Sequence, residues 1–138
     1  MAKGATAQAL AVGDTMVVQS VAQNASAAAL TASVSFIKLT TGVAFTTDIA
    51  GTAAAAIGTA SITGLAADGV YLASYYDTTN SKMVIFTADT GANVANNTTL
   101  SSGDLVNTTA AFIHVVGVVN MTAADYANFG ATNLAVAS

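Results

Sequence analysis

The chain has very little charge and lacks several residue types altogether. Only 7% of its 138 residues are charged, against roughly a quarter in an average domain. The acids are all Asp and the three bases are all Lys. The absence of cysteine excludes disulfides, thiolate metal sites and cysteine nucleophiles. A net charge of −4 with three lysines argues against nucleic acid as a partner, because phosphate binding needs clustered basic side chains.

Proline is also absent, so edge strands lack one common protection against pairing with another chain. The sequence holds no run of about 18 apolar residues, and we therefore predict no insertion into a membrane. The N-terminal stretch MAKGATAQALAVGD has no sustained apolar core. We interpret it as mature sequence without a cleavable signal.

The residues that are present are mostly small: 54% are hydrophobic, and alanine and threonine are the most frequent types. The length predicts one domain, which we divide into an N-terminal arm (1–13), a single β-rich domain (14–129) and a C-terminal tail (130–138). So few charges give a monomer little protection against association, which indicates that other copies of the chain cover part of the surface. The alternative is a surface rich in Thr, Asn and Ser that stays soluble without charges.

The run FIHVVGVVNMTAADY is the most informative stretch of the chain. Its β-branched residues predict a strand over 112–119. Strict alternation places Phe112, His114, Val116 and Val118 on one face, so neither face is polar. Such a strand is central in a sheet, or covered on both faces, or completed by a neighbouring subunit. A short helix is predicted to follow at about 122–128, with Asn120 or Thr122 as its N-cap.

The remaining elements are predicted from periodicity and from turn residues. We expect strands at 14–21 and 33–40, a short extended piece at 62–65, and a hairpin of strands 70–76 and 82–87. A helix at about 46–57 has Thr46 or Thr47 as its N-cap and Gly58 as its stop. Ser101–Asp104 leads into Leu105–Val106 and then into the strand at 112–119. The predicted fold class is mainly β, antiparallel and β-sandwich-like, with one or two short helices.

The hairpin VYLASYYDTTNSKMVIF, the segment LSSGDLV and the run FIHVVGVVNMTAADY occur in that order. Together they resemble the β-module near the C-termini of bacterial RTX-type adhesins and S-layer proteins exported by type I secretion. In that module a Val-x-Leu-x-Gly-Val strand leads to a Leu-Thr-x-x-Asp-Phe ending, and Val115–Val118 and Met121–Tyr126 stand at those places. The resemblance covers residues 43–129. The chain departs from it in lacking the Gly-Gly-x-Gly-x-Asp array that binds calcium in RTX proteins.

The resemblance implies a secreted bacterial surface protein, extracellular or on the cell surface, whose copies assemble into a filament or an S-layer-like lattice. It also implies an uncleaved export signal, which we expect in the tail at 130–138. The expected partners are other copies of the chain, with a cell-surface polysaccharide as a second candidate. Two other interpretations stay open: a bacteriophage virion component, either a capsid decoration or a tail protein, and a glycan-binding adhesin module that uses the tyrosines.

No catalytic grouping is recognisable, and we predict that the protein is not an enzyme. Its single histidine, His114, is expected to be a packed strand residue. No metal or organic cofactor is predicted, apart from calcium. Asp77 and Asp89 are its best candidate ligands, in loops that we expect to be neighbours. The alternative is that the Asp and Asn residues of these loops serve turn geometry.

An assembly interface is predicted from Met16, Val17 and Val18 on the first strand and from Tyr71 and Tyr75 of the hairpin. For the tyrosines, packing in the core is the alternative. We further expect residues 1–13 to lie against a neighbouring subunit, either by strand addition or by packing over its apolar face.

Overall fold

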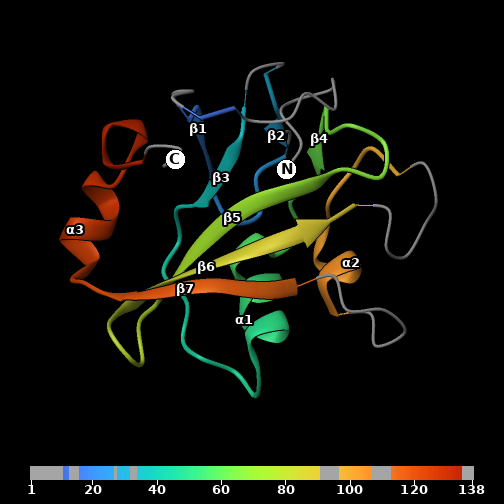
Figure 1. Cartoon of the computed structure of the whole chain (residues 1–138). Coiled ribbons are helices and arrows are strands. Elements are labelled where there is room, and N and C mark those ends of the chain that lie inside the picture. The colour runs from blue at the N-terminus through green and yellow to red at the C-terminus, as the bar shows by residue number, and fades with distance from the viewer. Residues whose placement is uncertain are drawn as a thin grey trace.

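The computed structural model describes residues 11–12, 16–26, 28–31, 34–90, 97–106 and 113–134. Its framework is a five-stranded sheet in the order β1-β3-β5-β6-β7 (Figure 1). These strands are β1 (Val18–Val21), β3 (Phe36–Leu39), β5 (Val70–Asp77), β6 (Lys82–Asp89) and β7 (Ile113–Asn120). A separate parallel pair is formed by β2 (Ala28–Ala29) and β4 (Ile62–Thr63). The predicted mainly β fold is confirmed.

The sheet is mixed. β1, β3 and β5 are parallel neighbours, whereas β5, β6 and β7 pair antiparallel. Parallel strands need a crossover, and the chain from β3 to β5 passes through the helix α1 (Ile49–Ile57). The predicted hairpin is confirmed and is longer than expected, because its ladder runs from Val70 opposite Asp89 to Asp77 opposite Lys82. The first strand is shorter than predicted and starts at Val18. Residues 1–10 and 13 of the predicted arm lie outside the described residues.

The helix α1 begins later than predicted. Asp48, not Thr46 or Thr47, is its N-cap, and its carboxylate accepts a hydrogen bond from the Gly51 N–H at 2.6 Å. The predicted stop at Gly58 is confirmed: this residue has φ +63°, and its N–H donates to the Ala54 carbonyl. Helices commonly end at a glycine because only glycine adopts this left-handed conformation without cost.

Two further helices and a single 3-10 turn complete the described elements. α3 (Ala123–Asn128) is close to its prediction, and Thr122 and Asp125 form a capping box at its start. The 3-10 turn η1 (Ala131–Asn133) follows it. α2 (Ser102–Val106) stands where we expected the chain to lead directly into the strand, so a helix was not predicted here. The Asp104 carboxylate accepts hydrogen bonds from the N–H and the hydroxyl of Ser101, and this local closure favours a helical turn.

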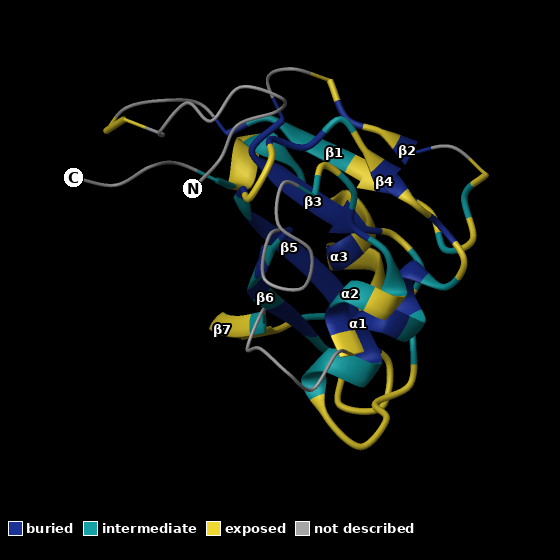
Figure 2. Ribbon diagram, turned by 90° about the vertical axis from the view of Figure 1, so that its right-hand side faces the viewer, coloured by how far each residue is buried: buried dark blue, intermediate teal, exposed yellow. Residues whose placement is uncertain are grey.

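Each face of the sheet has its own cover. α1, α2 and the β2–β4 pair pack on one face, over a core that includes Ile37, Tyr71, Tyr75 and Phe86. α3 packs on the opposite face, where Tyr126 lies against Tyr76 and Met83. Leu134, in the middle of the predicted tail, packs near Phe36 and Leu72. Helices therefore take the place that a second sheet would have in a sandwich, and β3 and β5 are buried between them (Figure 2).

β7 lies at the edge of the sheet. Of the three situations that we predicted for this run, a central position in the sheet is therefore wrong. Its ladder with β6 contains a bulge: Ile85 lies opposite Gly117 and Phe86 opposite Val115, so Val116 has no residue opposite it. One inserted residue reverses the alternation beyond it. Val115 and Val118 therefore lie on the same face of the sheet, contrary to the predicted alternation.

Candidate functional site

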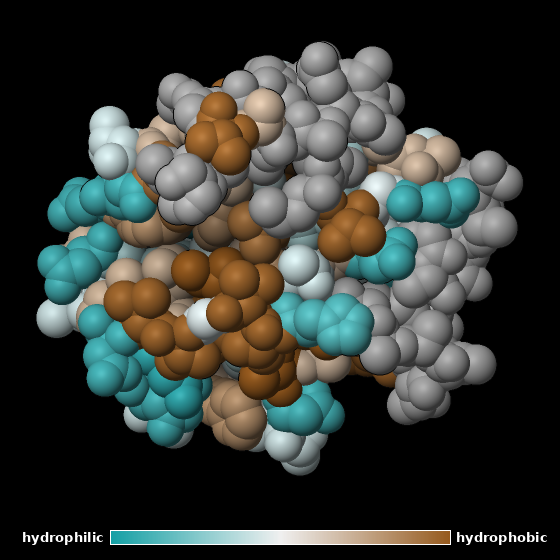
Figure 3. Space-filling model, in the orientation of Figure 1, coloured by the Kyte–Doolittle hydropathy of each residue, from teal (hydrophilic) through white to brown (hydrophobic). Residues whose placement is uncertain are grey.

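The largest exposed apolar feature of the described residues is β7. Four of its valines are about half exposed: Val115 44%, Val116 60%, Val118 50% and Val119 42%. The space-filling view shows brown, hydrophobic surface where β7 crosses the molecule (Figure 3). Scattered single apolar residues are normal on a surface, but a contiguous patch marks an interaction site. We call the strand Ile113–Asn120 with these valines the β7 edge.

The valines of the β7 edge are exposed on both faces of the sheet. Val115 and Val118 lie beside Phe86 and Val84, on the face that α1 covers farther in. Val119 lies beside Met83, on the face that α3 covers. Within the described residues β7 pairs with β6 alone. The strand is thus uncovered on both faces, and its outer backbone edge has no strand beside it there.

The other edge of the sheet is built differently. β1 has four residues, and its Val18 and Val21 pack into the two apolar clusters. The Gln19 side chain donates to the Ala29 carbonyl at 2.8 Å and accepts from the Thr31 N–H at 3.1 Å. This amide therefore ties β1 to the segment that contains β2. Short edges with such local bonds are poor templates for another strand.

The predicted interface residues are largely inside the molecule. Tyr71 and Tyr75 are fully buried in the core, which is the alternative that we stated for them, and Met16 is 4% exposed. Val17 and Val18 are half-buried and pack against the two clusters. These residues do not form an accessible surface, so the predicted interface is wrong in its location. The same burial removes Tyr71 and Tyr75 as a glycan-binding surface.

The pKa values of the two buried tyrosines are raised. Burial raises the pKa of Tyr75 to about 12, and the negative charge of Asp77 adds to the rise. Burial also raises the pKa of Tyr71, although a hydrogen bond from the Ala66 N–H to its hydroxyl opposes the shift. Both phenols stay neutral at ordinary pH, and their role is packing.

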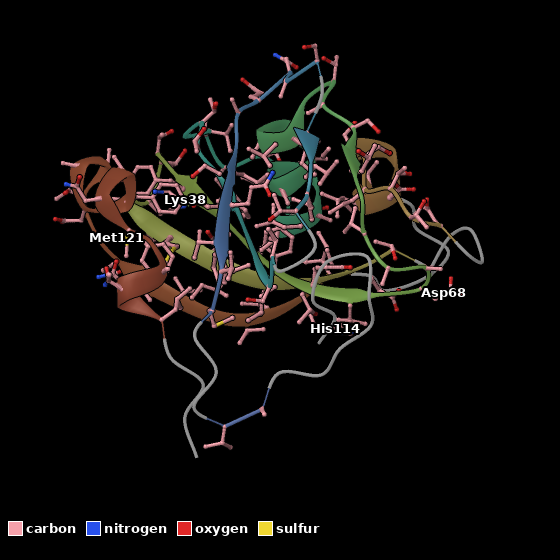
Figure 4. The ribbon with its side chains drawn as sticks, turned by 90° about the horizontal axis from the view of Figure 1, so that it is seen from above. Lys38, Asp68, His114 and Met121 are labelled. Carbon is pink, nitrogen blue, oxygen red and sulfur yellow. The ribbon has the colours of Figure 1, made fainter. Side chains whose placement is uncertain are left out.

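A buried lysine fastens α3 to the sheet. Lys38 is 5% exposed, and its ammonium donates to the carbonyls of Ala127 and Phe129 at 2.9 and 2.8 Å. These carbonyls are at the C-terminal end of α3, where a positive charge is favourable. The ammonium also lies 5.1 Å from the ring centre of Tyr126, whose hydroxyl donates to the Leu39 carbonyl at 2.8 Å. Burial lowers the pKa of Lys38. Figure 4 shows Lys38 pointing toward α3.

The two predicted calcium ligands are far apart. Asp77 is at the turn of the β5–β6 hairpin and Asp89 is at its open end, seven residues along the ladder. That spacing corresponds to about 24 Å, whereas calcium ligands lie about 2.5 Å from the ion. Asp77 is buried and accepts hydrogen bonds from the Thr79 N–H and from the N–H and amide of Asn80, which is the turn role. The expectation of neighbouring loops is wrong, and no single ion can bind both carboxylates.

The described residues contain no group of three or more His, Asp or Glu side chains that could hold a metal. His114 is exposed on β7, so its predicted packed position is wrong. A hollow of about 280 Å³ lies beside α3, lined by Met121, Asp125, Asn128, Phe129 and Asn133. Hydrogen bonds from Thr122 lower the pKa of Asp125 and engage its carboxylate in the capping box. None of these features forms a catalytic arrangement, and the β7 edge remains the candidate functional site.

Comparisons with protein-family models, with curated proteins and with solved structures give no match to this chain. Among the described residues, no helix has the length and apolar character needed to cross a membrane. The functional argument therefore depends on the geometry of the molecule itself.

Proposed function

We propose that this protein is structural and acts by self-association, its copies joined through the β7 edge in an extracellular filament or S-layer-like lattice. The observation that carries the proposal is one eight-residue strand with four half-exposed valines and no strand on its outer side among the described residues. Such an edge is a template for a further strand, and natural proteins normally blunt it with charge, proline or a bulge. β7 has no charged residue and no proline, and its bulge at Val116 leaves the ladder from Gly117 to Asn120 regular.

The composition supports the same conclusion. A surface with 7% charged residues gives weak electrostatic protection against association. The resemblance to modules of RTX-type adhesins and S-layer proteins adds the setting: secretion by a type I system and a place on a bacterial surface.

The energy available at the β7 edge fits a reversible contact. Four valines at about half exposure equal about two fully exposed valines, so covering them gains roughly 3 to 6 kcal/mol per copy. Each backbone hydrogen bond adds about 1 kcal/mol. Association costs about 4 to 15 kcal/mol in lost freedom. Two copies that cover both sets of valines gain roughly 6 to 12 kcal/mol, which is comparable to this cost, whereas a polar partner leaves only half of that gain.

Sedimentation velocity over a concentration series tests the proposal, with negative-stain microscopy of the concentrated sample. We expect the wild-type chain to associate as its concentration rises. A variant with Val115, Val116, Val118 and Val119 all changed to Thr keeps the shape and strand preference of valine but loses most of its hydrophobic gain. It should fold and remain monomeric.

The matched control changes an exposed valine elsewhere, Val106, to Thr. This control should associate like the wild type. A wild-type chain that stays monomeric at high concentration contradicts the proposed function. Association of the four-threonine variant at the wild-type level contradicts the role of the β7 edge.

A further inference from the structure

Gly117, in the middle of β7, has no explanation within the described part of the chain. Its φ lies outside the left-handed region, so the backbone does not require glycine. A Cβ built at this position meets no atom within 4 Å. Glycine inside a strand weakens it and often marks a place where another backbone or side chain approaches closely. The open space at Gly117 is therefore a notch in an otherwise valine-lined edge.

The hydrogen-bond pattern shows which backbone groups of β7 point outward. The Met121 N–H donates to the Ser81 carbonyl at 3.2 Å, so this pair is a hydrogen-bonded one. Antiparallel ladders alternate, and Val119 and Gly117 are then bonded to β6 as well. The N–H and carbonyl groups of Asn120 and Val118 consequently point away from the sheet. A strand that adds to this edge must bond to these two residues.

The distribution of exposure indicates how a partner docks. A partner that lies on one face of the sheet covers either Val118 or Val119, but not both. A strand added at the edge places its side chains beside β7 on both faces at once. To be covered in return, that strand must itself be apolar on both faces. Among the described strands, β7 is the one with large exposed apolar side chains on both faces.

Charge allows two copies to meet here. β7 carries no Asp, Glu, Lys or Arg, so a pairing of the strand with itself brings no like charges together. The chain as a whole is negative, with a net charge of −4, so a self-contact elsewhere opposes like charges more readily. This neutrality and the two-sided exposure select a second copy as the occupant.

Resting on the proposed function, we propose that two copies join by antiparallel pairing of their β7 strands about a twofold axis at Val118. In this register Val118 of each copy exchanges backbone hydrogen bonds with Val118 of the other. Val119 of one copy lies opposite Gly117 of the second copy, in a non-hydrogen-bonded pair where side chains are closest. The notch at Gly117 thus receives the valine. The bulge at Val116 ends the regular ladder on one side, and Asn120 ends the strand on the other.

Single cysteines test the axis cleanly, because the natural chain has none. Val118→Cys places two thiols across the axis with Cα atoms about 5.5 Å apart, which suits a disulfide. It should form a covalent dimer under mild oxidation. Val119→Cys puts its Cα atoms about 8 Å apart on a diagonal, beyond that reach. Val115→Cys is a control on the same strand, with 44% exposure. Neither control should cross-link at more than a tenth of the Val118→Cys rate.

Charge exchange provides a second, independent test. Val118→Lys and Val118→Asp each place like charges on the axis. The dissociation constant of each variant alone should therefore be at least tenfold higher than that of the wild type. Mixed together, the two variants should form a heterodimer, because a lysine then meets an aspartate. Rescue requires residue 118 of one copy to lie close to residue 118 of the other, and the cysteine cross-link then fixes the pair. Circular dichroism of each variant reports whether the monomer is folded.

The outcomes separate this inference from the proposed function. If the wild-type chain associates but Val119→Cys cross-links instead, or mixing gives no rescue, the β7 pairing at Val118 is overturned and self-association stands. If a chain lacking residues 1–10 no longer associates, the N-terminal segment is the occupant and the inference is again overturned. If the wild type does not associate at all, both this inference and the proposed function are contradicted. Selective cross-linking of Val118→Cys together with the rescue confirms the pairing.

Discussion

β5 and β7 have the same length and a similar apolar character, but opposite surroundings. β5, with the sequence VYLASYYD, is buried at every position after the first. β7, with the sequence IHVVGVVN, has no fully buried residue. The difference is position: β5 lies between β3 and β6 with helices over both faces, and β7 has β6 alone beside it in the described structure. An apolar strand therefore needs to be covered, and the position of the strand in the fold decides whether its own chain covers it.

The largest expected difference between the two strands is in how much a substitution lowers the stability of the monomer. Tyr75→Ala removes a fully buried ring from β5, together with its contact to Phe86. Loss of a large aromatic side chain from a core costs about 3 to 5 kcal/mol. Urea unfolding followed by fluorescence and circular dichroism should show this loss. A change below about 1 kcal/mol would contradict the burial of β5.

A second prediction concerns the cover that distinguishes β5 from β7. Lys38→Met keeps the bulk of the side chain but removes the charged donor to the Ala127 and Phe129 carbonyls. Hydrogen bonds to charged groups contribute roughly 1.5 to 3 kcal/mol, and part of this is regained because burial already lowers the pKa of the ammonium. The unfolding free energy should therefore fall by up to about 3 kcal/mol. Amide exchange in Ala123–Phe129 should quicken, because α3 is less firmly held.

Lys82→Met is the matched control for this change. Lys82 is half-buried at the start of β6, away from the end of α3 that Lys38 holds. The Lys82→Met substitution should leave amide exchange in α3 unchanged. Equal protection of α3 in the Lys38→Met and wild-type chains would show that its docking depends on Tyr126 and the surrounding apolar contacts alone.

The smallest effect is expected on β7. Val116 is 60% exposed and has no residue opposite it in the ladder with β6. Val116→Thr should therefore change the unfolding free energy of the monomer by no more than about 0.5 kcal/mol. The measurement is urea unfolding at a concentration below that of association. A loss as large as that of Tyr75→Ala would mean that β7 is covered within its own chain.

Local features were the most predictable from the sequence. The hairpin, the end of α1 at Gly58 and the cap of α3 depend on residues within a few positions of one another. The wrong prediction of the N-cap of α1 also has a local cause. Three residues that can cap a helix, Thr46, Thr47 and Asp48, stand side by side, and side-chain geometry selects Asp48. The separation of Asp77 and Asp89 could also have been predicted from the hairpin, because Asp77 lies at its turn and Asp89 at its open end.

Long-range features could not be predicted in the same way. The sequence of β7 indicates a strand that needs cover on both faces, but edge and central positions differ only in what lies beside the strand. The bulge at Val116 arises in the ladder with β6, and no residue near it requires a special backbone angle. Met16 and the tyrosines are apolar or aromatic, which fits an interface and a core equally well. Burial, which distinguishes the two, is a property of the whole fold.

The amide of Gln19 has a consequence for how far an assembly can grow. Because this side chain ties β1 to the segment around Ala29 and Thr31, β7 is the one long open edge of the sheet among the described strands. If two copies pair through β7 as we propose, strand addition stops after one step, because each molecule has already used its one long open edge. The proposed pairing would therefore not continue into the open-ended stacking of amyloid. Any longer polymer has the pair as its repeating unit and needs a second kind of junction between pairs.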